Sequence, residues 1–314
     1  MKPVMKVIRQ LPWVSSQSPT YCATIGFFDG VHKGHRFLLE QVKREAALRG
    51  LSTLAVTFSD HPRRALQTDY RPLLLTTADE KIKWLADCQL DACMVLDFTS
   101  EMASLTAQEF MRSYLYEGVG VRCLVIGHDH RFGCRRAESF DDYVRYGAEM
   151  GMEVVQASAF CDEGVTMSSS VVRRMLEGGR VKEAAFALGR PYALYGTVVE
   201  GRRVGRNLGF PTANLQPESP DLLVPALGVY AVWAEVDGQR YPAMLNIGRR
   251  PTLDNGTDCS IEAHLFGFSG DLYGKSLRLH FIERLRNEQK FASLDELRHQ
   301  LQMDAAITQR LLEG

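Results

Sequence analysis

Between residues 20 and 160, hydrophobic residues gather into short runs that are separated by segments with helical spacing. Runs such as Leu51–Phe58 and Val121–Ile126 are nearly continuous, which is typical of parallel strands buried on both faces. Segments such as Phe140–Met150 place apolar residues three or four positions apart and end at a glycine. Strands and helices that alternate in this way predict an α/β doubly wound parallel sheet. The predicted strands are 21–25, 51–58, 91–98, 121–126 and 152–157, and the predicted helices are 36–49, 78–87, 106–116 and 140–150.

After Tyr192 the period of the pattern shortens to that of half-buried strands. Apolar and polar residues alternate over 228–246, on both sides of Asp237-Gly238, a pair that is typical of a hairpin turn. Residues 260–266 and 276–282 predict further strands, and Gly, Pro and Asn punctuate the segments between them. Short strands without intervening helices indicate an antiparallel β-barrel.

A second helical pattern follows the predicted barrel. Ser293 and Glu296 match a capping box, so we expect a C-terminal helix from this point. Its predicted buried face is Leu294, Leu297, Leu301 and Ala305. A short helix at 181–188 precedes the change of pattern. We therefore predict two domains, 1–188 and 189–314.

The turn between the first predicted strand and helix carries candidate chemistry. It reads Gly26-Phe27-Phe28-Asp29-Gly30-Val31-His32-Lys33-Gly34-His35. A glycine-bearing turn before a helix points backbone N–H groups at an anion. His32 and His35 are three residues apart at the helix start, so both imidazoles can face one side and suit a phosphate that gains negative charge. The alternative interpretation is an ordinary turn with two surface histidines.

Two further predicted strands end in polar loops. Residues 59–63 follow one strand and read Ser-Asp-His-Pro-Arg, and residues 127–133 follow another and read Gly-His-Asp-His-Arg-Phe-Gly. Ligands of open α/β sheets bind at the carboxyl ends of strands, so we expect these loops at the same edge as the histidine turn. We favour His128 and His130 as loop residues, with metal ligands as the alternative.

Three consecutive serines, 168–170, precede Arg173 by one helical turn. A hydroxyl at a helix start is typical of an N-cap, but capping explains only one serine. Together with the arginine, the hydroxyls would also suit a triphosphate.

Candidate chemistry in the second half centres on residues 201–214. Gly201, Gly205 and Gly209 predict a pliant loop whose N–H groups can approach phosphates, although no Gly-Lys-Ser/Thr of a Walker A loop follows. Thr212 and Asn214 offer two neutral oxygens that suit one edge of a Mg²⁺ shell. Thr-x-Asn also occurs in ordinary turns.

Composition narrows the class of protein. Hydrophobic residues make up 45% and charged residues 24%, which is typical of a soluble globular protein. The formal net charge of −1 gives no support for a nucleic-acid or membrane surface. The odd number of cysteines, seven, and their scatter indicate reduced thiols of the cytoplasm. No run reaches transmembrane length, and residues 1–10 lack the pattern of a signal peptide.

The motifs also carry a resemblance. His32-Lys33-Gly34-His35 resembles the His-x-Gly-His signature of the nucleotidyltransferase superfamily, and its fuller form resembles the bacterial bifunctional riboflavin kinase/FAD synthetases. The similarity runs from about residue 20 to the end of the chain. It implies a Rossmann-like FMN adenylyltransferase domain followed by a riboflavin kinase barrel. The implied reactions phosphorylate riboflavin to FMN and adenylylate FMN to FAD and pyrophosphate.

The same resemblance implies the ligands. They are ATP (two per FAD), Mg²⁺, riboflavin and FMN, with no nucleic-acid or membrane partner, in a cytoplasmic monomer or weak homo-oligomer.

In the first domain the resemblance implies that His32 and His35 are catalytic and stabilise the α- and β-phosphates. The implied nucleotide-binding residues are Gly26, Phe27, Asp29, Gly30, Gly34, Ser168, Ser169, Ser170 and Arg173, and the implied flavin-binding residues are His61, Pro62, Arg63, Asp129 and Phe132. The chain departs from the family pattern at Asp60, usually proline, at His130, usually aromatic, and near Glu138, usually glycine.

In the second domain, Leu208–Asn214 is similar to the Pro-Thr-Ala-Asn motif of riboflavin kinases. The resemblance implies that Glu262 is the general base toward the ribityl 5′-hydroxyl; an outward, solvated glutamate is the alternative. Thr212 and Asn214 are the implied Mg²⁺ ligands. The implied nucleotide-binding residues are Gly201, Gly205, Gly209, Pro211, Thr212 and Asn214, and the implied flavin-binding residues are Asn246, Arg284 and Arg286.

Two other functions remain open at this point. The departures at Asp60, His130 and Glu138 motivate a monofunctional riboflavin kinase with a degenerate adenylyltransferase domain. A non-catalytic flavin- or nucleotide-binding regulator is the second alternative, and the retained Glu262 argues against it, because binding alone requires no base.

Overall fold

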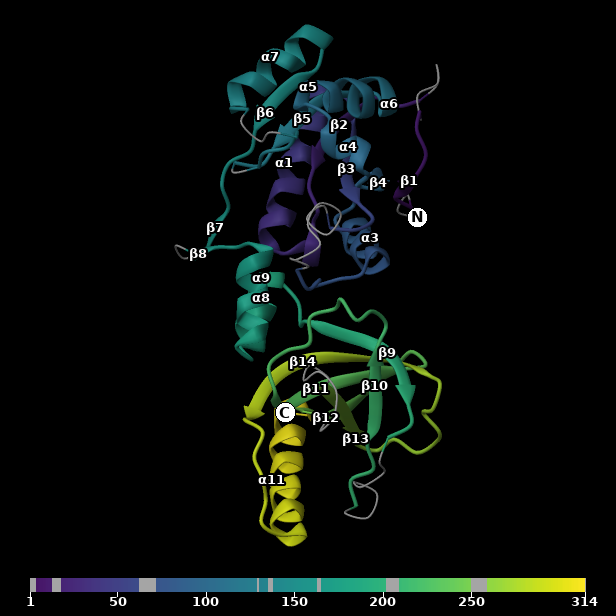
Figure 1. Ribbon diagram of the computed structural model, residues 1–314, viewed down its shortest axis with the longest axis vertical. Coiled ribbons are helices and arrows are strands. Elements are labelled where there is room, and N and C mark those ends of the chain that lie inside the picture. Colours follow the sequence, from purple (N-terminus) through teal and green to yellow (C-terminus); the bar gives the residue numbers. More distant parts are fainter. Residues whose placement is uncertain are drawn as a thin grey trace. The chain divides into compact units, whose positions relative to one another are not determined.

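The protein was analysed as a computed structural model, which describes residues 4–12, 18–61, 72–128, 130–134, 138–162, 165–201, 209–249 and 259–313 (Figure 1). The chain forms two compact units, Met1–Ser168 and Ser169–Gly314. Helices α8 (Ser169–Glu177) and α9 (Val181–Leu188) belong to the second unit, in which α9 contacts a barrel strand. The domain boundary between residues 188 and 189 stays a prediction.

The first unit contains a six-stranded sheet with the order β1-β4-β3-β2-β5-β6, and all five pairings are parallel. The predicted parallel sheet is therefore confirmed. The strands are β1 (Lys6–Ile8), β2 (Tyr21–Ile25), β3 (Ser52–Phe58), β4 (Ala92–Leu96), β5 (Val121–Ile126) and β6 (Glu153–Gln156), and β7 (Cys161–Asp162) pairs with β8 (Val165–Thr166) in a separate ribbon. The short edge strand β1 was not predicted, because three residues carry no readable period.

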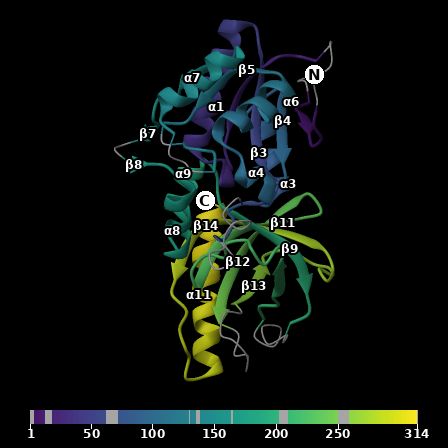
Figure 2. The same ribbon diagram turned by 45° about the horizontal axis from the view of Figure 1, so that its top comes forward.

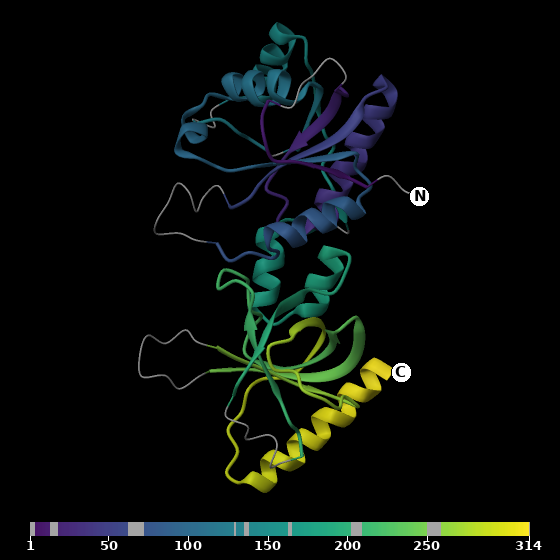
Figure 3. The same ribbon diagram turned by 90° about the vertical axis from the view of Figure 1, so that its right-hand side faces the viewer.

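Helices cover both faces of this sheet (Figure 3). One face packs against α1 (Lys33–Arg49) and α3 (Ala78–Asp87). The other face packs against α4 (Ser100–Ser104), α5 (Ala107–Phe110), the π-helix η2 (Met111–Tyr116), α6 (Glu117–Val119) and α7 (Phe140–Met150). Thr106 and Glu109 form the predicted capping box. Each face of the central strands is thus buried, which explains their continuous apolar runs.

The second unit contains a closed antiparallel barrel with the order β10-β13-β12-β11-β14-β9, so the predicted barrel is confirmed. Asp237 and Gly238 both have positive φ, as a tight hairpin turn requires. The strands are β9 (Ala193–Val199), β10 (Ala213–Pro217), β11 (Gly228–Val236), β12 (Gln239–Arg249), β13 (Cys259–Leu265) and β14 (Ser276–Arg286).

The C-terminal helix α11 (Leu294–Glu313) packs against β11 and β12 (Figure 2). Ala305 is buried as predicted, but Leu294 is 64% exposed, so its assignment to the buried face was wrong. The inward face includes Asp304 and Thr308 instead. Asp304 can be buried because Arg286 on the barrel neutralises it, with Nη2 2.8 Å from Oδ2.

Candidate active sites

The carboxyl ends of β3, β2 and β5 are neighbours in the sheet. The chain runs from β2 through α1 to β3 on one side, and β5 joins β2 on the other. The strand order therefore reverses beside β2, which is where ligands of open α/β sheets bind. This arrangement confirms that the loops after residues 25, 58 and 126 share one edge.

The turn after β2 has an unusual backbone that is anchored by a buried carboxylate. Phe28, Gly30 and Val31 all have positive φ, which is rare for a side chain such as that of Val31. The Asp29 carboxylate, 2% exposed, accepts hydrogen bonds from the backbone N–H groups of Leu75 and Thr76 at 3.0 and 3.1 Å. Asp29 thus ties the turn to the segment that precedes α3. Its direct contact with a nucleotide stays a prediction.

His32 and His35 stack on each other at the start of α1. Their ring centroids are 3.6 Å apart with an interplanar angle of 22°, and His32 Nδ1 accepts a hydrogen bond from the His35 N–H at 3.3 Å. His32 is buried, so the interpretation of two surface histidines is wrong for this residue. A Cβ at Gly34 would lie 3.0 Å from the Met167 carbonyl oxygen and 3.1 Å from the His32 ring. A side chain at position 34 would therefore force the His32 ring or the Met167 carbonyl to shift.

Burial, followed by the neighbouring His32, Lys81 and His130, holds the pKa of His35 well below its ordinary value. The His35 imidazole is consequently neutral at neutral pH. A neutral imidazole has one N–H donor and one acceptor, and it can donate a hydrogen bond to a phosphate oxygen.

The sequence analysis missed Lys81, which lies beside this turn. Its Nζ donates a hydrogen bond to the Phe58 carbonyl oxygen at 2.6 Å and lies 3.9 Å from the centroid of the Phe27 ring. The Phe27 ring in turn contacts the His61 ring, with centroids 4.5 Å apart. A signal was available in the sequence, because Lys81 is four residues before the buried Leu85 and so falls on the inward face of α3.

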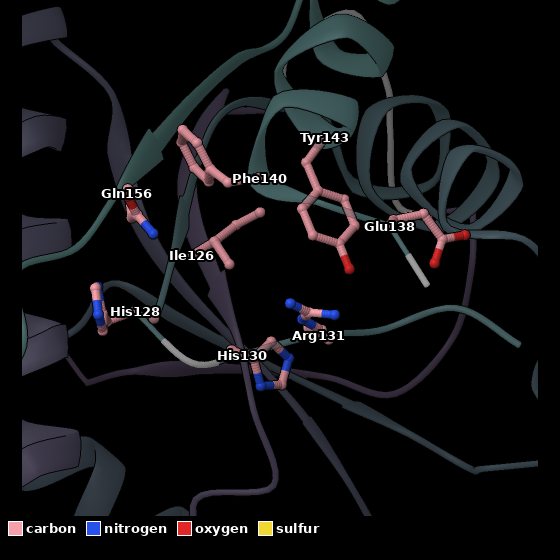
Figure 4. A pocket seen from close by; sticks show the side chains of 9 residues that line it. Ile126, His128, His130, Arg131, Glu138, Phe140, Tyr143 and Gln156 are labelled. Carbon is pink, nitrogen blue, oxygen red and sulfur yellow. The ribbon is translucent and has the colours of Figure 1, made fainter. Parts of the chain in front are cut away.

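A cavity of about 120 Å³ opens at the carboxyl ends of β5 and β6 (Figure 4). It lies in the predicted flavin-side loop, and the departures His130 and Glu138 both line it. Phe132 does not line it; its buried ring stacks on Tyr143 with centroids 4.6 Å apart and supports the loop from the core. The lining residues are Ile126, Gly127, His128, His130, Arg131, Glu138, Phe140, Tyr143 and Gln156.

The described residues contain no group of three or more His, Cys, Asp or Glu side chains that could hold a metal ion. Among these residues, no third His, Cys, Asp or Glu side chain joins His128 and His130, so the interpretation of the two histidines as metal ligands has no further support here. Pro62, Arg63, Asp129 and Gly205 lie outside the described residues. Ser168 ends the first unit, and Ser169, Ser170 and Arg173 start the second, so the predicted triphosphate clamp stays a prediction.

In the second unit, strand register brings the predicted kinase residues into one row. Glu262 on β13 is paired with Asn214 on β10 on one side and with Asn246 on β12 on the other. Ile261 and Ala263, the neighbours of Glu262, are buried in the barrel, so Glu262 points to the outer face. Directly paired residues share a face, and the three polar side chains therefore lie together.

Thr212 and Gly201 complete this polar row. Thr212 Oγ1 donates a hydrogen bond to Glu262 Oε2 at 3.4 Å. A Cβ at Gly201 would lie 2.0 Å from Asn214 Nδ2, so any other residue at position 201 would displace this amide. Glu262 thus points outward, as in the alternative interpretation, but it is half-buried in a polar cluster. Its role as general base stays a prediction.

The two predicted flavin-binding arginines have structural contacts. The Arg286 guanidinium binds Asp304, with Nε 3.1 Å from Oδ1 and 3.0 Å from Oδ2. Arg284 donates a hydrogen bond to the Leu227 carbonyl oxygen and packs against Gly179 and Gly228. Their contact with flavin stays a prediction.

Comparisons with known proteins cover both units. Family models of FAD synthetase and of riboflavin kinase match residues 14–171 and 188–312. Proteins named bifunctional riboflavin kinase/FMN adenylyltransferase from Escherichia coli (strain K12) and Pseudomonas fluorescens are 38% and 36% identical; the alignments cover 96% of each chain for the first and 98% for the second. A solved Streptococcus pneumoniae structure, named as a macrolide-efflux protein, has a TM-score of 0.87 and 32% identity, and covers 97% of this chain and 99% of that chain.

The name of the Streptococcus structure refers to efflux, whereas the family models and the curated relatives agree on flavin enzymes. Of the helices that the structure describes, none combines the length and the apolar character needed to cross a membrane. The histidine turn falls in the match to FAD synthetase, and the polar row of the barrel falls in the match to riboflavin kinase. This chain belongs to the family of bifunctional riboflavin kinase/FMN adenylyltransferases.

Proposed function

We propose that the barrel phosphorylates riboflavin and that the sheet domain adenylylates the resulting FMN, each with its own molecule of ATP. The observation that carries this proposal is that the chain holds two distinct sets of polar residues, one in each unit. Both sets coincide with the matches to the corresponding family models. Two ATP are then consumed per FAD.

In the kinase step, Glu262 acts as the general base. It accepts the proton of the ribityl 5′-hydroxyl while that oxygen forms a bond to the γ-phosphorus of ATP, and ADP leaves. The 3.4 Å contact between Thr212 and Glu262 supports this role, because the hydroxyl orients the carboxylate. Gly201 and Gly209 cover the nucleotide phosphates, with Pro211 beside them, and Asn246, Arg284 and Arg286 support the flavin.

The oxygen atoms around Glu262 fit a magnesium ion. Thr212 offers a hydroxyl and Asn214 an amide carbonyl, and Mg²⁺ prefers such oxygen ligands together with nucleotide phosphates and water. The close approach of Gly201 holds the Asn214 side chain, which is 8% exposed. Mg²⁺, when bound, would neutralise charge on the phosphates.

In the adenylyltransferase step, a phosphate oxygen of FMN attacks the α-phosphorus of ATP and pyrophosphate leaves. His32 and His35 stabilise the phosphates by hydrogen bonding, and the turn from Gly26 to Gly34, which includes Phe27, Asp29 and Gly30, supplies backbone N–H groups. Ser168, Ser169, Ser170 and Arg173 hold the triphosphate. His61, Pro62, Arg63, Asp129 and Phe132 belong to the flavin side.

One incubation of the protein with riboflavin, ATP and Mg²⁺ tests both reactions, with riboflavin, FMN and FAD separated by chromatography over time. We expect FMN to appear first and FAD to follow. Glu262→Gln should stop FMN formation but leave FAD formation from added FMN intact. A protein with His32 and His35 both replaced by alanine should accumulate FMN.

The same assay decides between the alternatives. If the unmodified protein makes FMN but never FAD, the alternative of a monofunctional riboflavin kinase is correct. If it does not convert riboflavin at all, the alternative of a non-catalytic binding protein is correct. The stacked pair of His32 and His35, of which His32 is buried, favours the bifunctional hypothesis over a degenerate domain. We further propose that the protein is a monomer or weak homo-oligomer. We also place it in the cytoplasm, a reducing compartment, because six cysteines among the described residues are free.

A further inference from the structure

Lys81 is a buried cation at the same sheet edge as the histidine pair. Its side chain belongs to α3 and is 2% exposed. Its Nζ bonds the carbonyl oxygen of Phe58, the last residue of β3, and lies over the ring of Phe27, which follows β2. One amine thus connects the ends of β2 and β3, and the loops that follow these strands contain predicted nucleotide-binding and flavin-binding residues.

Packing alone does not explain a lysine at this position. Among the residues that the structure describes, Lys81 forms no salt bridge; its contacts are a carbonyl dipole and an aromatic face. These contacts stabilise an ammonium group without neutralising it. An apolar side chain would fill the same space without a desolvation cost, as Leu85 does one turn later on α3. The retained charge therefore requires a reason other than folding.

Charged and titratable groups from several segments of the sheet domain act on Lys81 and His35. Burial lowers the pKa of Lys81 to about 8, while Asp29, Cys93 and Asp60, in that order, favour its charged form. The amine is therefore mostly protonated at neutral pH. On α1, the positive charge of Lys81 contributes, after burial and His32, to the low pKa of His35, and His130 acts in the same direction.

We propose that Lys81 is a positioning residue of the adenylyltransferase site, whose ammonium group holds Phe27 and the end of β3 and places a fixed positive charge near His35. His35 then acts as a neutral hydrogen-bond donor toward the phosphates, and the buried Lys81 supplies the positive charge. This inference rests on the proposed role of the histidine pair. It adds a residue that neither the motif nor the resemblance contains.

The test compares three single variants in the full chain. Lys81→Met removes the charge, and Lys81→Arg keeps it. Lys83→Met is the matched control, because Lys83 lies on the same helix, has a side chain that is 70% exposed, and forms an ion pair with Glu80. FAD formation from FMN and ATP is measured across the pH range, and riboflavin phosphorylation in the same samples reports on the intact barrel. The imidazole titration of His35 is followed by NMR in each protein.

We expect Lys81→Met to lower the rate of FAD formation about tenfold and to raise the titration midpoint of His35 by about one pH unit. The acid limb of the rate profile should move to higher pH by the same amount. Lys81→Arg should keep the His35 midpoint at its wild-type value. The rate of FAD formation should stay high above pH 8 in this variant, whereas the wild-type lysine loses its proton there. Lys83→Met should match the wild type.

An unchanged His35 midpoint in Lys81→Met would overturn the proposal. If Lys81→Met does not fold, Lys81→Arg still decides, since an alkaline limb identical to that of the wild type would show that the amine is not the titrating group. Absence of FAD formation in the wild type would instead refute the proposed function. The NMR titration would then still measure the effect of Lys81 on His35.

Discussion

Replacing Gly201 by alanine tests the kinase site through a single methyl group. Gly201 does not need a positive φ, so the cost of the change is space and not backbone strain. The new Cβ would lie 2.0 Å from Asn214 Nδ2 and 2.5 Å from Cγ, and contacts this short do not occur. Asn214 must therefore move by about 1 Å, and a displacement of that size at a reacting centre costs about 10²-fold in rate, or about 2.7 kcal/mol of barrier.

The assay measures kcat/KM for riboflavin phosphorylation in Gly201→Ala and in the wild type, with FMN adenylylation as the internal control. Because Asn214 is paired with Glu262 across β10 and β13, we expect the phosphorylation rate to fall by about two orders of magnitude while adenylylation stays unchanged. The thermal unfolding of the barrel should also be recorded, since a large loss of stability would explain the rate trivially. A well-folded variant that phosphorylates riboflavin within about twofold of the wild type would refute the reasoning.

Three further predictions address other contacts. Arg286→Met removes the cationic partner of the Asp304 carboxylate, which is 1% exposed, and leaves it only the Gln300 amide among its described side-chain donors. The barrel should be destabilised by about 3–5 kcal/mol in denaturant unfolding, and a change below about 1 kcal/mol would contradict a buried ion pair. Gly34→Ala, whose methyl would press on the His32 ring, should slow FAD formation about tenfold and spare FMN formation. Because folding depresses the pKa of His35 below 6.5, the contribution of His35 to stability is complete above pH 6.5 and is lost as the pH falls toward the folded-state pKa. His35→Gln should remove that part of the pH dependence of the unfolding free energy. An identical pH dependence in the variant and the wild type would contradict this role of His35.

The sequence by itself determined the elements of the sheet domain and the place of its first site. Strands such as 121–126 are buried on both faces, so their apolar runs are continuous and readable without coordinates. Parallel strands joined by helices must end at one edge, and that rule alone brought the loops after residues 25, 58 and 126 together. The pair His32 and His35 was readable because helical geometry fixes the relation between residues three apart.

Tertiary structure decided the features that depend on distant parts of the chain. The row of Asn214, Glu262 and Asn246 requires the register of three strands and the closure of the barrel, and local patterns do not encode either. Leu294 looked buried by its spacing, yet it is exposed, because the barrel covers a face of α11 that includes Asp304. Lys81 appeared as one charged residue on an amphipathic helix, and only the packing of α3 against the ends of β2 and β3 buries its charge beside the histidines. In each case the free energy of a side chain depends on neighbours that are remote in sequence, so its role is set by the assembled fold.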